Sequence, residues 1–304
     1  MNPGGKDLDA IVLRGLTKQY GTHRGIEDLT FSVTRGEVFG FLGPNGSGKS
    51  TALRTLVGLI APTSGEATVL GMPISSHTEN MLARIGYLPG SLALYPSMTG
   101  RSLLRLFADV RGIDCDESVE SYAERLKVDL DRRIGDLSKG NRQKIGVIQA
   151  FMHEPEVLFL DEPTSGLDPL IQREFEMMLN EVKARGGTVM LSSHVLSEVE
   201  HLADRIAIIN EGRLVVVEQI STLKAKALRT IDLHFDAPQS ADPYTTSEGV
   251  ISAVAHGSVV SCTVVGSEYA LLKTAVENKV VSVVTSEPSL DDIFLQYVKT
   301  GTIQ

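Results

Sequence analysis

The chain of 304 residues is long enough for about two domains, and its 42% hydrophobic and 22% charged residues are ordinary for a soluble globular protein. Its formal net charge of −9 at pH 7 argues against a nucleic-acid-binding protein, because phosphate backbones are bound where Lys and Arg are in excess. No stretch approaches the roughly 20 apolar residues that cross a bilayer, and Met1 to Asp7 lack an apolar signal core. If the protein works at a membrane, another chain is expected to supply the spanning part.

The most informative stretch follows a predicted strand, the apolar run Val38 to Leu42. Strands are also predicted before it, from Ile11 to Tyr20 and from Leu29 to Val33. The residues after the run fit the phosphate-loop pattern G-x-x-x-x-G-K-[ST]: Gly43, Pro44, Asn45, Gly46, Ser47, Gly48, Lys49, Ser50 and Thr51. A helix is predicted next, because apolar residues recur at helical spacing from Leu53 to Ile60.

This loop has the chemistry of a triphosphate-binding site. Its glycines allow a sharp turn that brings backbone N–H groups close to an anion, and the helix N-terminus adds partial positive charge. Lys49 is expected to reach the β- and γ-phosphates, and the Ser50 hydroxyl to bind Mg²⁺. A glycine-rich turn that merely precedes a helix is the alternative, but strand, loop, Lys-Ser pair and helix occur in order. The loop therefore predicts a nucleoside triphosphate site.

Tyr20 ends the first predicted strand just before Gly21 and allows two interpretations. It is either a half-buried aromatic residue at a turn or a flat platform on which a purine base stacks. The residue pattern alone leaves both open.

The middle of the chain is predicted to be mainly helical, after short strands at Gly65 to Leu70 and Arg84 to Leu88. One helix is expected to bury a single apolar face made of Leu103, Leu104, Phe107 and Val110. A second helix is predicted from Glu117 to Lys127, and Ser138 is expected to cap a third.

Two carboxylates end the next predicted strand. Val157 to Leu160 is a continuous apolar run, typical of a strand buried on both faces, and ligands gather at the C-terminal ends of such strands. A plain strand exit is the alternative, but the phosphate loop favours a functional pair. Asp161 suits Mg²⁺ binding through water, and Glu162 suits the general base that activates a water molecule.

The strand after that, Thr188 to Ser192, leads to Ser193 and His194. A single histidine after a strand is more often structural, but His194 is expected at the same ligand edge as Glu162. The remaining histidines show no ligand spacing and are interpreted as surface residues. A hairpin from Arg205 to Val217 is predicted to close this part of the chain.

From about Gln219 the pattern predicts a compact α+β domain of β-β-β-α-β type. Within it, Asp236 to Gly249 is interpreted as a polar loop, and a last helix is predicted from Ser289 to Lys299. The predicted domains are residues 1–218, with a helical part at about 90–152, and residues 219–304. Two distant cysteines, Cys115 and Cys262, predict neither a disulfide framework nor a zinc site and fit a reduced cytosolic protein.

The motifs together resemble the ATP-binding subunits of ABC transporters, in particular the bacterial drug- and antibiotic-exporter type. The resemblance covers roughly residues 10–218 and rests on the phosphate loop, Leu137-Ser138-Lys139-Gly140-Asn141, Leu160-Asp161-Glu162-Pro163-Thr164, Ser165-Gly166-Leu167-Asp168 and Ser193-His194. It implies an α/β P-loop NTPase cassette with a mixed sheet core, an antiparallel β subdomain and a helical subdomain, plus a small C-terminal α+β domain.

The resemblance also implies an ATPase that uses ATP and Mg²⁺ and powers a separate permease. Tyr20 and the phosphate loop would hold ATP, Ser50 would bind Mg²⁺, and Asp161 would bind it through water. Lys49, Glu162 and His194 would act in hydrolysis. The ATP bound to a second, identical cassette would be contacted by the signature segment, Leu137 to Asn141, and by Asp168. The resemblance places the protein at the cytoplasmic face of the plasma membrane.

Two positions depart from the family's pattern. Gly90 stands where these proteins usually have Gln after Tyr-Leu-Pro, so no side-chain oxygen is available there for Mg²⁺ or water. Either a neighbour or water substitutes, or hydrolysis is slower. Lys139 and Asn141 replace the usual Gly and Gln of the signature segment, which is a mild change because the cap depends chiefly on Ser138 and on backbone N–H groups.

Two other functions are compatible with the motifs. One is a soluble ABC ATPase acting on ribosomes or DNA, although such proteins usually carry two cassettes or a long coiled coil. The other is a nucleotide-binding regulator that hardly hydrolyses ATP, as Gly90 suggests.

For a transporter, the permease is expected to dock near Gly90 to Pro96. The tail, including Pro288 to Phe294, resembles the extension of exporter-type subunits and is expected to serve dimer contact or regulation.

Overall fold

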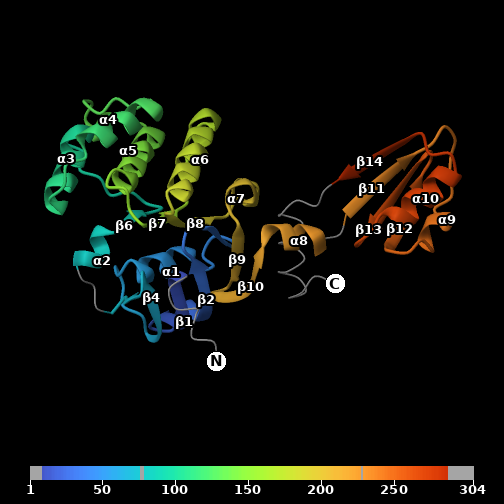
Figure 1. Ribbon diagram of the computed structural model, residues 1–304, viewed down its shortest axis with the longest axis horizontal. Helices are drawn as coiled ribbons and strands as arrows, with labels where there is room; N and C mark the ends of the chain where they lie inside the picture. Colours follow the sequence, from blue (N-terminus) through green and yellow to red (C-terminus); the bar gives the residue numbers. More distant parts are fainter. Residues whose placement is uncertain (1–8, 76–78, 227–228, 287–304) are drawn as a thin grey trace. The chain divides into compact units, whose positions relative to one another are not determined.

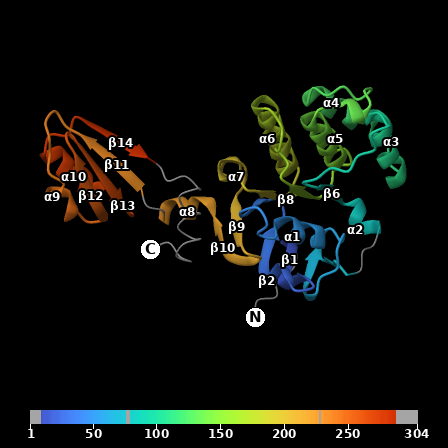
Figure 2. The same cartoon turned by 180° about the vertical axis from the view of Figure 1, so that it is seen from behind.

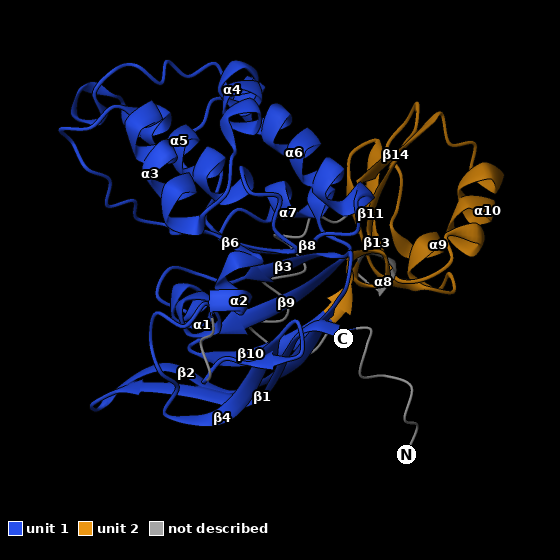
Figure 3. Ribbon diagram, turned by 60° about the vertical axis from the view of Figure 1, so that its left-hand side comes forward, with its two compact units in different colours: residues 1–217 blue, residues 218–304 orange. Residues whose placement is uncertain are grey.

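The computed structural model describes residues 9–75, 79–226 and 229–286. The chain divides into two compact units, Met1–Val217 and Glu218–Gln304 (Figure 3). The larger unit contains a mixed sheet, an antiparallel sheet and a block of helices, so the predicted α/β cassette fold is confirmed.

The antiparallel sheet carries the two strands predicted at the start of the chain. Its order is β2-β1-β4-β5, and its strands are β1 (Asp9–Tyr20), β2 (His23–Thr34), β4 (Ser64–Val69) and β5 (Met72–Pro73). The buried apolar residues of β1 and β2 belong to one core cluster with those of helix α1 (Lys49–Leu56). This packing places the end of β1 beside the first turn of α1.

The second sheet positions the functional residues, and its order is β10-β9-β3-β8-β7-β6. The strands are β3 (Val38–Leu42), β6 (Ile85–Leu88), β7 (Val157–Asp161), β8 (Thr188–Ser193), β9 (Arg205–Asn210) and β10 (Arg213–Gln219). Strand β8 lies between β3 and β7, runs parallel to both, and all three are fully buried. Leu42 pairs with Ser193, and Asp161 pairs with Ser192, so the three carboxyl ends meet at one edge.

The predicted hairpin at the end of this sheet is formed by β9 and β10. Its two loop residues, Glu211 and Gly212, have φ of 46° and 77°. Positive φ at both positions is what the type I′ turn of a two-residue hairpin requires.

The helical block contains α3 (Gly100–Arg111), α4 (Asp116–Arg125), the short helix η1 (Ile134–Asp136) and α5 (Lys139–Phe151). Figures 1 and 2 show α3, α4 and α5 gathered beside α6 (Pro169–Ala184). Aromatic side chains join them, because the Phe151 ring lies 6.1 Å from Tyr122 and 6.0 Å from Phe175 between ring centroids. The apolar face of α3 is narrower than predicted, since Leu103 and Leu104 are buried but Val110 is 78% exposed.

Two further helices, α2 (Glu79–Ala83) and α7 (Leu196–Leu202), flank the core sheet. His153, which follows α5, is half-buried, whereas the sequence places it among the surface histidines. Its Nε2 lies 3.0 Å from the Ile85 carbonyl oxygen, and its Nδ1 is buried without a hydrogen-bond partner among the described residues. Burial, together with the charge of Arg111, lowers the pKa of His153 to about 4.

The smaller unit differs from the predicted β-β-β-α-β order. Its elements are α8 (Ile220–Lys226), β11 (Arg229–His234), α9 (Asp242–Thr245), β12 (Val250–His256), β13 (Val259–Val264), α10 (Tyr269–Glu277) and β14 (Ser282–Ser286). From β11 onward they form a β-α-β-β-α-β unit with the antiparallel order β12-β13-β11-β14. The missed helix α9 is too short to show a period, yet it buries Tyr244 against Phe235. The predicted helix Ser289 to Lys299 and the segment Pro288 to Phe294 lie outside the described residues.

Cys115 and Cys262 are both buried and free in the described residues. Within the same ranges, no helix combines the length and the apolar character that a membrane crossing requires.

Candidate functional site

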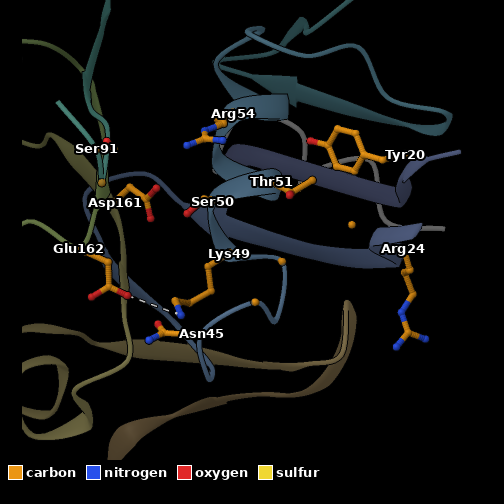
Figure 4. Close-up of a pocket in the computed structure, with 14 residues that line it drawn as sticks. Tyr20, Arg24, Asn45, Lys49, Ser50, Thr51, Arg54, Ser91, Asp161 and Glu162 are labelled. Carbon is orange, nitrogen blue, oxygen red and sulfur yellow. Dashed lines mark ion pairs between the residues drawn. The ribbon is translucent and has the colours of Figure 1, made fainter. Parts of the chain in front are cut away.

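A pocket of about 380 Å³ lies at the edge where β3, β8 and β7 end (Figure 4). It brings together residues from the end of β1, the phosphate loop, the start of α1 and the end of β7. The predicted residues that line it are Tyr20, Asn45, Gly46, Gly48, Lys49, Ser50, Thr51, Asp161 and Glu162. Gly90 lines it as well.

The phosphate loop has its predicted form because several of its glycines admit no side chain. A Cβ on Gly43 would lie 2.3 Å from the Ile209 carbonyl oxygen, and a Cβ on Gly48 would lie 2.5 Å from that of Gly25. Gly48 also has φ of 108°, which L-residues with a side chain rarely adopt. The loop therefore approaches β2 and β9 backbone to backbone and ends at the first turn of α1.

Lys49 is held by the loop that precedes it. Its Nζ donates to the carbonyl oxygens of Gly43 at 2.7 Å and Pro44 at 3.2 Å. These two residues therefore position the Lys49 side chain, although they are not among the residues that line the pocket. Burial lowers the pKa of Lys49, and the charge of Glu162, whose Oε1 lies 3.6 Å from Nζ, acts in the opposite direction. The result is a partly desolvated cation aimed at the pocket, which strengthens its attraction to an anion.

Glu162 has a strained backbone that its neighbours hold in place. Its φ is 51°, in the left-handed region, and its N–H donates to the backbone oxygen of Ser192 at 3.1 Å. Such strain persists where surrounding contacts over-determine it, and it clusters at functional sites. The Glu162 side chain is directed to Lys49 on one side and to His194 on the other, with 2.7 Å between Oε2 and His194 Nδ1. His194 thus joins the site through Glu162.

Asp161 offers one oxygen to a ligand. Its Oδ1 accepts a hydrogen bond from the Ser192 hydroxyl at 2.6 Å, whereas its Oδ2 is buried without a hydrogen-bond partner in the described part of the chain. Ser50 lines the same pocket. No cluster of three or more His, Cys, Asp or Glu side chains suited to a metal occurs among the described residues. One carboxylate and one hydroxyl fit Mg²⁺, which takes few protein ligands and completes its shell with phosphate oxygens and water.

Tyr20 lies at the rim of the pocket and is 45% exposed. Lys18 Nζ lies 5.4 Å from the centroid of its ring. A Cβ on Gly25 would lie only 3.0 Å from the ring carbon Cε2, so the glycine lets β2 pass close to the ring. A planar surface is therefore available beside the start of α1, as base stacking requires.

The signature segment, Leu137 to Asn141, packs on the segment 165–168 and is not among the residues found lining the pocket. Ser138 Oγ caps α5 by accepting from the Asn141 N–H at 3.2 Å, as predicted. A Cβ on Gly140 would lie 2.5 Å from the Gly166 carbonyl oxygen, and Lys139 Nζ donates to Ser165 Oγ at 3.3 Å. Asp168 caps α6 by accepting from the N–H groups of Leu170 and Ile171. These residues therefore form one surface, separate from the pocket of their own chain.

Four pocket residues were missed from the sequence: Arg24, Gly25, Arg54 and Ser91. Arg54 had a usable signal, because it follows Ser50 by one helical turn and so shares its face of α1. Ser91 directly follows Gly90, and the departure of Gly90 from the family's pattern was a signal for this part of the loop. Arg24 and Gly25 had no signal, since only the pairing of β1 with β2 brings them to the pocket.

Comparisons with known proteins agree with this geometry. The profile of the ABC transporter family matches residues 26–165. The chain is 34% identical over 95% of its length to the bacitracin transport ATP-binding protein BcrA of Bacillus licheniformis, of which it covers 97%. It is 32% identical to the Nod factor export ATP-binding protein I of Rhizobium meliloti, with 97% of this chain and 89% of that protein aligned.

Solved structures are similar as well. One, an ATP-binding subunit of an ABC transporter, matches with a TM-score of 0.66 and 30% identity, over 71% of this chain and 92% of that one. Another, a dimeric ATP-binding cassette in a post-hydrolysis state bound to ADP and Pi, has a TM-score of 0.64 at 21% identity, over 69% of this chain and 98% of that one, and shares the fold. This chain therefore belongs to the ATP-binding subunits of ABC transporters and is an ATPase.

Proposed function

We propose that this chain hydrolyses Mg·ATP between two copies of itself and thereby drives a separate permease that exports antibiotics, drugs or lipid-like compounds. The relatives named for bacitracin transport and Nod factor export support this class of cargo. Subunits of this family pair with membrane permeases, which supports a location at the cytoplasmic face of the membrane.

The observation that carries the hydrolytic mechanism is the contact of Lys49, Glu162 and His194 at the end of three adjacent strands. An ionised Glu162 can only accept hydrogen bonds, so His194 Nδ1 donates to it. His194 Nε2 then donates to the γ-phosphate in the imidazolium form, in which both ring nitrogens carry a hydrogen. Lys49 moves from Glu162 to the phosphates when ATP enters, and Glu162 then accepts a proton from the attacking water. Mg²⁺, held by Ser50 and Asp161, neutralises phosphate charge when bound.

The second copy supplies the other half of each site. In each chain Ser138, Gly140 and the N-terminus of α5 are anchored to the segment that ends at Asp168. Facing the γ-phosphate of the other copy, this surface adds backbone N–H donors and closes only when both chains meet. Asp168 then connects the two sites.

The permease contact is proposed at the exposed apolar side chains near Gly90 to Pro96, with a helix end of the permease as the occupant. Tyr95 is exposed within this segment, and Leu82 of α2 and Val110 of α3 are exposed apolar residues as well. Arg111 donates to the Leu82 carbonyl oxygen at 3.2 Å, which joins α2 to the end of α3. Residues 219–304 are proposed as an accessory domain for dimer contact or regulation.

The test is phosphate release by the parent chain and by Glu162→Gln, with ATP binding measured on the same samples. Loss of the general base should lower turnover at least 100-fold while ATP still binds. Lys49→Ala is the companion variant and should lose ATP binding itself. Equal, near-zero turnover by parent and Glu162→Gln would instead identify a nucleotide-binding regulator. The chain should copurify in detergent with a co-expressed permease that is encoded next to it. If it does not, the transport role is rejected.

A further inference from the structure

The loop residue Gly90 lies directly against the carboxylate of Asp161. A Cβ built on Gly90 would lie 3.0 Å from Asp161 Oδ2 and 3.2 Å from its Cγ. Contacts of that length are tighter than ordinary van der Waals packing, so a larger residue would push the loop away from β7. Glycine at this position therefore brings the loop backbone onto the one Asp161 oxygen that has no partner in the described residues.

The residue after Gly90 carries a hydroxyl into the same pocket. Ser91 lines the pocket with Ser50 and Asp161. In Figure 4, Ser91 and Asp161 lie on one side of the pocket, and Ser50 and Arg54 project from α1 on the other. Successive Cα atoms are about 3.8 Å apart, so the close approach of Gly90 keeps Ser91 next to Asp161 as well.

The Glu162 carboxylate and the second oxygen of Asp161 are already engaged. Both carboxylate oxygens of Glu162 have cationic or imidazole partners, Lys49 and His194. Asp161 Oδ1 is taken by Ser192. Arg54 is a cation and cannot be a metal ligand, but it can bind a phosphate oxygen. Ser91 is a neutral oxygen ligand that lines the same pocket as Asp161, whose Oδ2 has no hydrogen-bond partner in the described residues.

We propose that the hydroxyl of Ser91 contributes to the Mg²⁺ site of ATP together with Ser50 and Asp161. Mg²⁺ prefers hard oxygen ligands in a compact octahedron, which a serine hydroxyl satisfies. The small size of Gly90 allows this arrangement, because it draws the loop in far enough for the short Ser91 side chain to act. The inference rests on the proposed function, since the metal enters with the nucleotide.

The experiment measures metal binding rather than turnover. The full chain is saturated with a non-hydrolysable ATP analogue, Mn²⁺ replaces Mg²⁺, and free Mn²⁺ is followed by electron paramagnetic resonance. Ser91→Ala should weaken Mn²⁺ binding to the complex about tenfold, as loss of a metal-site partner typically does. Binding of the analogue in EDTA should be unchanged. Ser91→Thr, which keeps the hydroxyl, should bind Mn²⁺ like the parent.

Two further variants make the result specific. Ser97→Ala is the matched control, because Ser97 is an exposed serine of the same loop that is not among the residues lining the pocket, and it should not alter Mn²⁺ affinity. Gly90→Ala should weaken Mn²⁺ binding, because its Cβ displaces the loop from Asp161.

Equal Mn²⁺ affinity of Ser91→Ala and the parent would overturn the inference. So would an equal loss of nucleotide binding with and without metal, which would place Ser91 on the phosphates. If the parent itself shows no metal-dependent nucleotide binding, the proposed function fails instead, so the two failures are distinguishable.

Discussion

His194 Nδ1 lies 2.7 Å from Glu162 Oε2, and this contact joins the ends of the neighbouring strands β7 and β8. The other Glu162 oxygen lies 3.6 Å from Lys49 Nζ. Glu162 is therefore held between an imidazole and an ammonium group. A γ-phosphate competes for both partners, so nucleotide entry and activation of Glu162 are expected to be linked.

His194→Ala should lower the maximal rate of phosphate release about 100-fold, a typical loss for one transition-state donor. Its effect on ATP affinity should stay within about threefold, because Lys49 and the loop N–H groups remain. Separate kcat and KM values from steady-state kinetics check this. His201→Ala, an exposed histidine of α7, is the control and should behave like the parent. A His194→Ala change confined to KM would contradict the assignment.

Tyr20→Ala should weaken ATP binding about tenfold, because stacking of a base on an aromatic ring contributes roughly 1–3 kcal/mol. Tyr20→Phe should bind ATP normally, since the ring is kept. Inorganic tripolyphosphate, which has no base, should compete equally well in the parent and in Tyr20→Ala. Isothermal titration calorimetry with both ligands measures these affinities. An equal loss for tripolyphosphate would mean that Tyr20 only supports the loop.

Gly140→Ala should abolish the ATP-dependent dimer while each chain still binds nucleotide. The new Cβ would lie 2.5 Å from the Gly166 carbonyl oxygen, so the signature segment and the segment 165–168 cannot keep their packing. Sedimentation velocity in the Glu162→Gln background, where ATP is not consumed, reports dimerisation. Lys139→Ala removes only an exposed hydrogen bond to Ser165 and should have a smaller effect. Normal dimers of Gly140→Ala would exclude this surface from the interface.

His153 predicts a specific dependence of stability on pH. Its pKa is about 4 in the folded chain against an ordinary value of 6.5. As pH falls from 6.5 towards 4, His153 therefore binds a proton in the unfolded state but not in the folded state. The free energy of unfolding decreases as a result, by about 3 kcal/mol at most. His153→Gln keeps a donor for the Ile85 carbonyl and should remove this slope.

Urea unfolding of parent and His153→Gln at several pH values gives the difference directly, because the other titrating groups cancel. A pH-independent difference between the two chains would show that the folded His153 titrates normally.

Local chemistry along the chain was enough to predict much of this protein. The phosphate loop, the strand that ends in Asp161 and Glu162, and the cap at Ser138 each depend on residues close together in sequence. Their spacing, glycine content and periodicity are visible without any fold. The errors arise where residues close together in sequence do not determine the structure. A four-residue helix such as α9 is too short to show a period. Neither the exposure of Val110 nor the burial of His153 Nδ1 is set by neighbours in sequence.

The assembly of the site, in contrast, is a property of the folded sheet. Lys49, His194 and Glu162 converge because β8 lies between β3 and β7 in register, and strand order depends on contacts between distant segments. The same holds for Arg24 at the pocket rim, for Gly90 against Asp161 and for Gly140 against Gly166. Sequence periodicity shows which face of an element is buried, but only tertiary packing chooses what that face meets.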